Sequence, residues 1–108
     1  MKNQYRQGDV FLEQVAKAPK EARPIDREGG DVILAHGEVT GHAHRIGAIN
    51  ATLQQATDGE RYLTIAGEHI ALLTHEEHAP IALPPGDYRV TIQREYDWAE
   101  QASRAVAD

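Results

Sequence analysis

The alternation of apolar and polar residues predicts a chain made mainly of β-strands. The clearest case is residues 88–96, where Tyr88, Val90 and Ile92 alternate with polar or charged residues. A period of two gives a strand one buried face and one solvated face. Residues 5–15 are enriched in aromatic and branched side chains, which favour extended backbone, and they predict an opening strand.

Shorter apolar runs predict further strands in the middle of the chain. Residues 31–34 and 70–74 each predict a short buried strand. Residues 51–65 predict a hairpin, because two extended runs flank an Asp-Gly pair, which is a strong turn signal. Residues 81–83 lie between prolines, and this restricts them to the edge of a sheet.

Two segments interrupt the strand pattern. Residues 16–30 contain two prolines, several charges and a closing Gly-Gly, and they predict a mobile, solvated loop. Near the C-terminus Asp97 is a candidate N-cap, and residues 98–106 predict a short helix. The chain from 1 to 108 is therefore expected to be a single, mainly β domain, either a small barrel or a sandwich, with one short C-terminal helix.

Composition and charge exclude several classes of function. Cysteine is absent, which excludes disulfides, thiolate metal sites and thiol nucleophiles. The single serine, Ser103, is far along the chain from the histidine clusters, and this argues against a Ser-His-Asp hydrolase. A net charge of −6 with scattered basic residues argues against a nucleic-acid partner. With neither a membrane-length apolar run nor an apolar leader, we expect a cytoplasmic protein with no membrane partner.

Two clusters of histidine are the strongest functional signal. They lie in the strings AHGEVTGHAHRI and THEEHAPI. In an extended segment His42 and His44 point to the same face, and a tight turn would bring His75 and His78 together. Neutral imidazole nitrogens are ligands for borderline cations. We therefore predict a site for a divalent transition metal (Zn, Ni, Mn or Fe) held by these four histidines.

Carboxylates lie within both clusters. Glu38, Glu76 and Glu77 are each a candidate ligand, a group that orients an imidazole, or the residue that moves protons in catalysis. The HEEH spacing is one residue short of the helical HExxH motif, so a zinc-protease helix is not indicated. His36 and His69 lie near glycines in expected turns, and their roles stay open. The competing interpretation is that all of these side chains are solvated surface groups.

Three strings carry a resemblance to known proteins: YRQGDV, HGEVTGHAHRI and THEEHAPIALPPGDYRVTIQREYDW. They resemble a small family of uncharacterised bacterial and phage-borne proteins over most of the chain, which implies no activity. The chain is also loosely similar to the cupins, β-barrels whose metal site uses an HxH pair, a glutamate and a later histidine. That resemblance implies the pair His42 and His44 and a later ligand, His75 or His78, although no glutamate follows His44 at the cupin spacing.

Two hypotheses about the function of this protein follow, one a metal site and the other a protein-binding module. The first is a small metal-binding β domain, acting as a metal-dependent enzyme or an accessory protein, with a water or small-molecule ligand completing the metal shell. The second is a non-enzymatic protein-interaction module in which the histidines are structural or interfacial and Trp98 helps to dock a partner. An exposed strand edge is also compatible with a homo-oligomer.

Overall fold

The computed structural model describes residues Asn3–Gln93, and this part of the chain consists of strands, turns and loops without a helix. The mainly β fold expected from the sequence is therefore confirmed. Ten strands follow one another: β1 (Gln4–Gln7), β2 (Val10–Val15), β3 (Arg23–Pro24), β4 (Val32–His36), β5 (Ala43–Ile46), β6 (Ala51–Gln55), β7 (Arg61–Ile65), β8 (Ala71–His75), β9 (His78–Leu83) and β10 (Gly86–Ile92).

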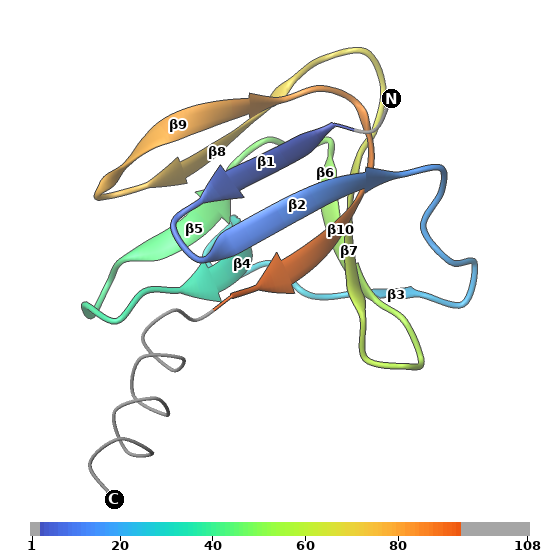
Figure 1. The fold of residues 1–108 in the computed structure, drawn as a ribbon, viewed down its shortest axis with the longest axis horizontal. Helices are drawn as coiled ribbons and strands as arrows, with labels where there is room; N and C mark the ends of the chain where they lie inside the picture. Colours follow the sequence, from blue (N-terminus) through green and yellow to red (C-terminus); the bar gives the residue numbers. More distant parts are fainter. Residues whose placement is uncertain (1–2, 94–108) are drawn as a thin grey trace, which may run out of the picture.

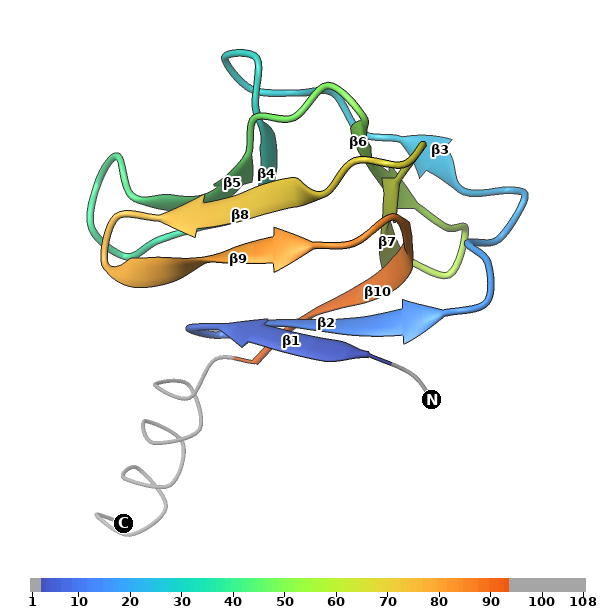
Figure 2. The ribbon, with the colours of Figure 1, turned by 90° about the horizontal axis from the view of Figure 1, so that it is seen from above.

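The strands form two antiparallel sheets (Figures 1 and 2). One sheet has six strands in the order β1-β2-β10-β7-β6-β3, and the other has four in the order β4-β5-β8-β9. The sequence did not decide between a closed barrel and a sandwich. The barrel is wrong, because strand pairing does not join the two sheets into a single closed one. β9 lies at an edge, as its prolines predicted, since proline has no N–H to donate to a second neighbour.

The core is built from the alternating apolar positions of both sheets. In β10, Tyr88 and Val90 are buried while Arg89 and Thr91 face solvent. The same alternation buries Leu12 and Val10 in β2, and buried leucines, isoleucines and valines of the other strands complete the cluster. Burial of this apolar surface is the main favourable contribution to the fold's stability.

The opening segment differs from its prediction. Residues 5–15 do not form one strand, because a two-residue turn, Gly8-Asp9, separates β1 from β2. Gly8 has a φ of 59°, a left-handed conformation that glycine adopts at little cost. The turn reverses the chain, so that Gln7 pairs with Val10.

Other boundaries follow the sequence more closely. The predicted hairpin is present as β6 and β7, joined through the Asp58-Gly59 turn. The predicted loop 16–30 is mostly exposed and contains the short strand β3. Its mobility stays a prediction. The predicted helix 98–106, with Trp98, lies outside the described residues.

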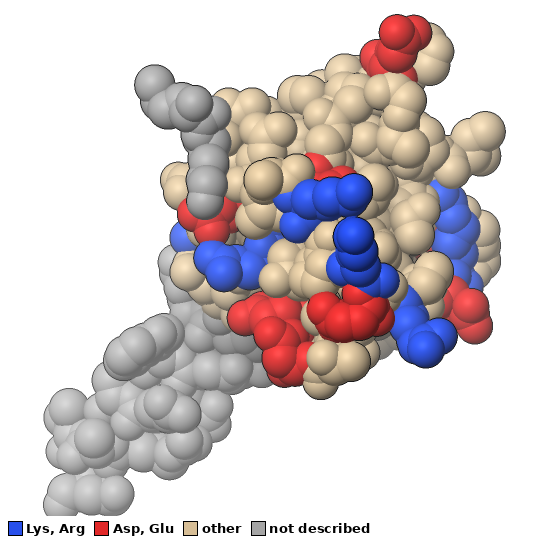
Figure 3. Space-filling view, turned by 90° about the vertical axis from the view of Figure 1, so that its right-hand side faces the viewer, with Lys and Arg blue, Asp and Glu red and all other residues tan. Residues whose placement is uncertain are grey.

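Three turns meet at one end of the fold. They are the β1–β2, β4–β5 and β8–β9 connections, which lie together on the left of Figure 1 and again in Figure 2. On the opposite end, shown in Figure 3, basic and acidic side chains lie side by side and leave no large area of one charge on that face. Within residues 3–93 there is no helix that could cross a membrane.

Candidate metal centre

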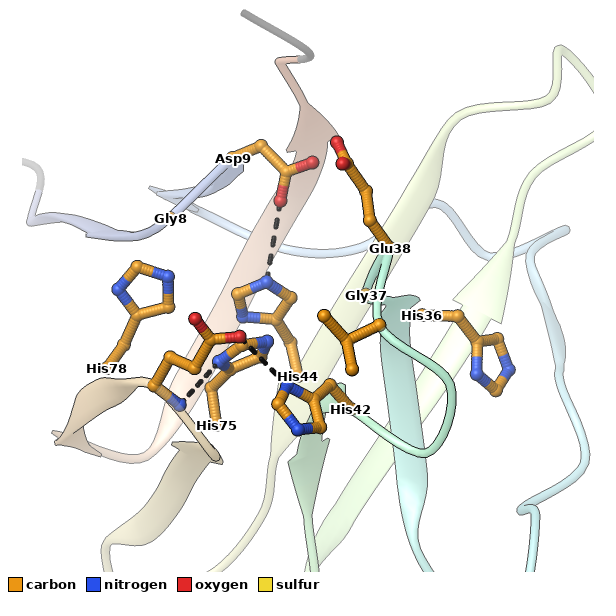
Figure 4. A pocket seen from close by; sticks show the side chains of 11 residues that line it. Gly8, Asp9, His36, Gly37, Glu38, His42, His44, His75 and His78 are labelled. Carbon is orange, nitrogen blue, oxygen red and sulfur yellow. Dashed lines mark hydrogen bonds and ion pairs between the residues drawn. The ribbon is translucent and has the colours of Figure 1, made fainter. Parts of the chain in front are cut away.

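The three turns enclose an open cleft of about 460 Å³ (Figure 4). Its walls come from both sheets, since the β1–β2 turn belongs to the six-stranded sheet and the other two turns belong to the four-stranded sheet. The lining combines histidines, carboxylates, glycines and one valine: Gly8, Asp9, His36, Gly37, Glu38, Val39, His42, His44, His75, Glu77 and His78.

Strand pairing brings the two histidine clusters together. β5 pairs with β8 so that Arg45 lies opposite Thr74, which places His44 beside His75. Their rings stack with centroids 4.3 Å apart. HEEH is a hairpin turn, in which His75 and His78 face each other at the ends of β8 and β9.

All four predicted ligand histidines therefore line one cleft (Figure 4). Ring centroids are 4.8 Å apart for His75 and His78, and 5.9 Å apart both for His44 and His78 and for His42 and His75. His42 immediately precedes β5 and reaches the same cleft as His44, as expected for residues two apart in an extended segment.

His44 is the most constrained of the four. It is 3% exposed, and its Nδ1 lies 2.8 Å from Oε1 of the buried Gln7. The Gln7 amide has a fixed orientation, because its Nε2 donates to two carbonyls, Leu73 O and Ala79 O, each at 3.0 Å. Gln7 Oε1 is thus an acceptor, and His44 Nδ1 must carry the proton. In the neutral ring, Nε2 is then an unprotonated nitrogen.

The neutral form of His44 is favoured by its surroundings. Burial lowers the pKa of His44, and the neighbouring His75 and His78 lower it further, while Asp9 acts in the opposite direction. Desolvation disfavours a charged imidazolium, and so do nearby groups that can carry the same charge. A neutral imidazole is the form that binds a metal ion.

His42 is oriented in the same way by a different partner. Its Nδ1 donates to Glu77 Oε2 over 2.9 Å. A carboxylate can only accept, so the Nδ1–H tautomer is fixed and Nε2 is again unprotonated in the neutral ring. Hydrogen bonds of this kind hold ligating histidines in many metal sites.

His75 has the opposite tautomer. Its Nδ1 accepts a hydrogen bond from the backbone N–H of Glu77 over 3.0 Å. The neutral ring therefore carries its proton on Nε2. As it stands, His75 is a hydrogen-bond donor, whereas His42 and His44 each have an unprotonated Nε2.

Glu76 is held outside the lining of the cleft. Its Oε1 accepts from the backbone N–H of Ala43 at 3.0 Å, and its Oε2 accepts from Arg45 at 2.9 Å. The Ala43 bond is the main reason that the pKa of Glu76 is lowered, and its own backbone N–H and the Arg45 charge contribute. A carboxylate with a lowered pKa is a weaker base, so this geometry does not favour the general-base role considered for Glu76.

The other two predicted carboxylates both line the cleft. Glu77 is occupied in holding His42. Glu38 projects into the cleft mouth near Asp9, and Figure 4 draws no bond between its carboxylate and any other lining residue. Of the three predicted carboxylates, Glu38 is thus the one that lines the cleft without a bond to another lining residue in Figure 4.

His36 and His69 do not join the four. His36 Nε2 lies 3.0 Å from Glu28 Oε1, and its exposed ring lies on the far side of Gly37 from the other imidazoles (Figure 4). His69 is exposed in the connection between β7 and β8, where its carbonyl accepts from Asn50.

A family model described as a domain of unknown function, DUF8820, matches residues 6–93. The chain belongs to this family. The match begins in β1 and ends just after β10, so it includes all three turns of the cleft. No curated protein and no solved structure matches the chain.

Within this DUF8820 domain, the sequence analysis missed the contribution of the first turn. Gln7, Gly8 and Asp9 were assigned to a continuous strand, yet Gln7 fixes His44 and the other two line the cleft. A signal was present, because Gly-Asp between two alternating segments is a recognised two-residue hairpin loop. Contact between this loop and histidines more than thirty residues away had no signal in the sequence.

Proposed function

We propose that the cleft binds one divalent transition-metal ion, and that the protein is a small metal-binding β domain with ligands drawn from His42, His44, His75 and His78. The observation that carries this proposal is the convergence of these four side chains in one cleft, together with the fixed Nδ1–H tautomers of His42 and His44. Orientation of an imidazole by a second group lowers the cost of binding an ion.

The charge of the lining also favours a cation. Asp9, Glu38 and Glu77 line the cleft, and lysine and arginine are absent from its lining among residues 3–93. A cleft walled by carboxylates and neutral imidazoles attracts positive charge and disfavours anionic ligands.

The distances between donor atoms and the hydrogen bonds of the histidines favour different sets of metal ligands. Donor atoms of His42, His75 and Glu76 lie within 4.8 Å of one another. However, Glu76 and His75 Nδ1 already accept hydrogen bonds, while the Nδ1 contacts of His42 and His44 leave Nε2 of each neutral ring unprotonated. We give more weight to hydrogen bonding, because a ligand nitrogen must be unprotonated. His42 and His44 are the principal ligands, and His75 and His78 complete the shell after small side-chain rotations.

The donor set suits zinc, nickel, manganese or iron, which accept nitrogen and oxygen ligands. The open side of the cleft leaves room for a water molecule or a small ligand on the ion. A metal ion supplies Lewis acidity at that position and lowers the pKa of a bound water. Glu38, which lines the cleft, can accept its proton.

The test uses protein purified without an affinity tag. Elemental analysis is expected to find near-stoichiometric metal, and titration of the stripped protein with Zn²⁺, Ni²⁺ or Mn²⁺ is expected to raise its thermal unfolding temperature. At a free metal concentration 100 times Kd the stabilisation is about 2.7 kcal/mol. A His42→Ala, His44→Ala double variant should lose both effects.

His69→Ala is the matched control, because His69 is an exposed histidine outside the cleft. It should bind metal as the wild type does. Metal-free protein that gains no stability from any of the three ions would overturn the proposal and favour the interaction module.

A further inference from the structure

The carboxylate of Asp9 faces Nε2 of His44 across the cleft. Asp9 Oδ1 lies 3.4 Å from His44 Nε2, and the two side chains approach from opposite walls of the cleft (Figure 4). Because Gln7 holds the proton on Nδ1, the neutral ring presents a lone pair to a carboxylate oxygen. The contact is long for a hydrogen bond, and a cation placed between this nitrogen and this oxygen would be in reach of both.

The separation suits an ion better than a direct hydrogen bond. A charge-assisted bond between an imidazolium and a carboxylate is about 2.7–2.9 Å long, shorter than the 3.4 Å found here. Two ligands that each lie about 2.0–2.1 Å from a tetrahedral Zn²⁺ are about 3.4 Å apart. The Asp9–His44 pair therefore already has the spacing of two ligands on one ion.

We infer that the Gln7-Gly8-Asp9 turn is the second half of the metal site, with Asp9 as a carboxylate ligand beside His44 and Gln7 as the positioning residue for His44. This inference rests on the proposed metal-binding function. It adds an anionic oxygen ligand to a set of imidazoles, and this favours a divalent ion over a neutral ligand.

Gly8 allows the turn to approach the histidines. A Cβ at this position would lie 2.9 Å from His78 Nε2 and 3.2 Å from His44 Cε1. A Cβ contact of 2.9 Å is essentially never found in proteins, so a side chain at residue 8 would displace the His78 ring or the turn. The absent side chain is what lets Asp9 reach His44.

The ion would connect the two sheets. Asp9 lies between β1 and β2 of the six-stranded sheet, and His44 lies in β5 of the four-stranded sheet. Gln7 already links the same sheets through its bonds to Leu73 O and Ala79 O. Between the pairs Leu73–Ile81 and His75–His78, β9 has one more residue than β8, and the Ala79 carbonyl lies within this bulge.

The first test compares Asp9→Asn with Asp31→Asn by zinc titration calorimetry. The two aspartates are similarly exposed, at 31% and 37%, but Asp31 lies outside the cleft lining. Asp9→Asn should weaken zinc binding at least about tenfold, since it removes a charged ligand, and Asp31→Asn should leave the affinity unchanged. Wild-type affinity in Asp9→Asn would overturn the inference alone. A wild type that binds no zinc would overturn the proposed function and the inference together.

The second test addresses Gln7 with a readout that general destabilisation does not move. Gln7→Met keeps the side-chain volume but removes the amide, so His44 should no longer be fixed as the Nδ1–H tautomer in ¹⁵N NMR spectra, and zinc affinity should fall about 10- to 100-fold. Gln54→Met removes a hydrogen bond to Thr64 outside the cleft and should change neither quantity. An unchanged His44 tautomer in Gln7→Met would contradict the positioning role.

Discussion

Two buried polar side chains at opposite ends of the fold, Tyr88 and His44, differ in their polar contacts. Tyr88, where β9 passes into β10, is fully buried, and its hydroxyl donates to Pro84 O at 2.6 Å. Tyr5 packs edge-on against the same ring. His44, at the end with the three turns, is almost as buried, but its Nε2 faces the carboxylate of Asp9. The Tyr88 hydroxyl has a short hydrogen bond within the chain, whereas the His44 ring lines an open cleft and its Nε2 lies 3.4 Å from Asp9.

The comparison separates structure from function. Buried polar groups in native proteins almost always have hydrogen-bond partners, and those without one are informative. At the Tyr88 end the chain supplies every partner, so we assign that end to stability. At the His44 end the chain fixes the ring through Gln7 but leaves Nε2 at the long distance of 3.4 Å from Asp9 beside an open cleft, and we assign that end to ligand binding.

At the His44 end, the largest loss of stability is expected from Gly8→Ala. The left-handed backbone and the collision with His78 and His44 should together cost about 2–4 kcal/mol in the free energy of unfolding. Gly29→Ala is the matched control, because Gly29 has nearly the same φ, 61° against 59°, but nothing within 4 Å of its Cβ position. Urea unfolding of both variants measures the difference.

Zinc affinity separates these two glycines further. Gly8→Ala should bind zinc more weakly, because the added methyl group displaces the imidazoles. Gly29→Ala should lose only the backbone contribution to stability and keep its zinc affinity. Equal stability losses in the two variants would show that the rings near Gly8 are not packed as described.

A smaller effect is expected from Tyr88→Phe at the other end. Loss of the bond to Pro84 O should cost about 1 kcal/mol at neutral pH. Burial raises the pKa of Tyr88 to about 12, from an ordinary value of 10.0. The unfolded chain therefore releases this proton first, so the stabilising contribution is complete below pH 10 and is lost as the pH rises toward 12.

The difference in unfolding free energy between wild type and Tyr88→Phe, measured by urea unfolding from pH 8 to pH 12, isolates this group from other titrating residues. The difference should shrink above pH 10, and zinc affinity should be the same in both proteins. A difference that is independent of pH would contradict the raised pKa of Tyr88.

An effect on zinc affinity is expected from Glu77→Gln. The amide oxygen can still accept from His42 Nδ1, but the negative charge is lost. Because the Glu77 side chain is 60% exposed, solvent screens that charge. Zinc affinity should fall by at most about tenfold, the lower end of the range for groups that orient ligands. Glu68→Gln, an exposed change outside the cleft, is the control, and equal affinities in these two variants would remove Glu77 from the site.

Much of the fold could be predicted because local pattern determines it. Alternation identified β10, and Asp58-Gly59 identified the β6–β7 hairpin. Closure of the sheets could not be predicted, because it depends on which strands pair at long range, and the barrel was therefore as plausible as two sheets. The Gly8-Asp9 turn was missed because the surrounding β-prone residues outweighed a two-residue turn signal.

The site was predictable to the extent that its residues are close in sequence. His42 and His44, and likewise His75 and His78, form pairs whose spacing alone suggested a common direction. That the pairs meet depends on the pairing of β5 with β8, and their tautomers depend on Gln7 and on the Glu77 backbone. No spacing rule contains that information. The roles inferred for Gln7 and Asp9 became visible only once both sheets were in place.

Nitrogen-15 NMR of the histidine rings, recorded before and after addition of Zn²⁺, tests the metal site most directly. Before zinc, His44 should be neutral with its proton on Nδ1, His42 should carry a proton on Nδ1, and His75 should carry one on Nε2. Zinc should shift the Nε2 resonances of His42 and His44 while their Nδ1 protons remain. A His44 ring protonated on both nitrogens at neutral pH, paired directly with Asp9 and unmoved by saturating zinc, would contradict the account.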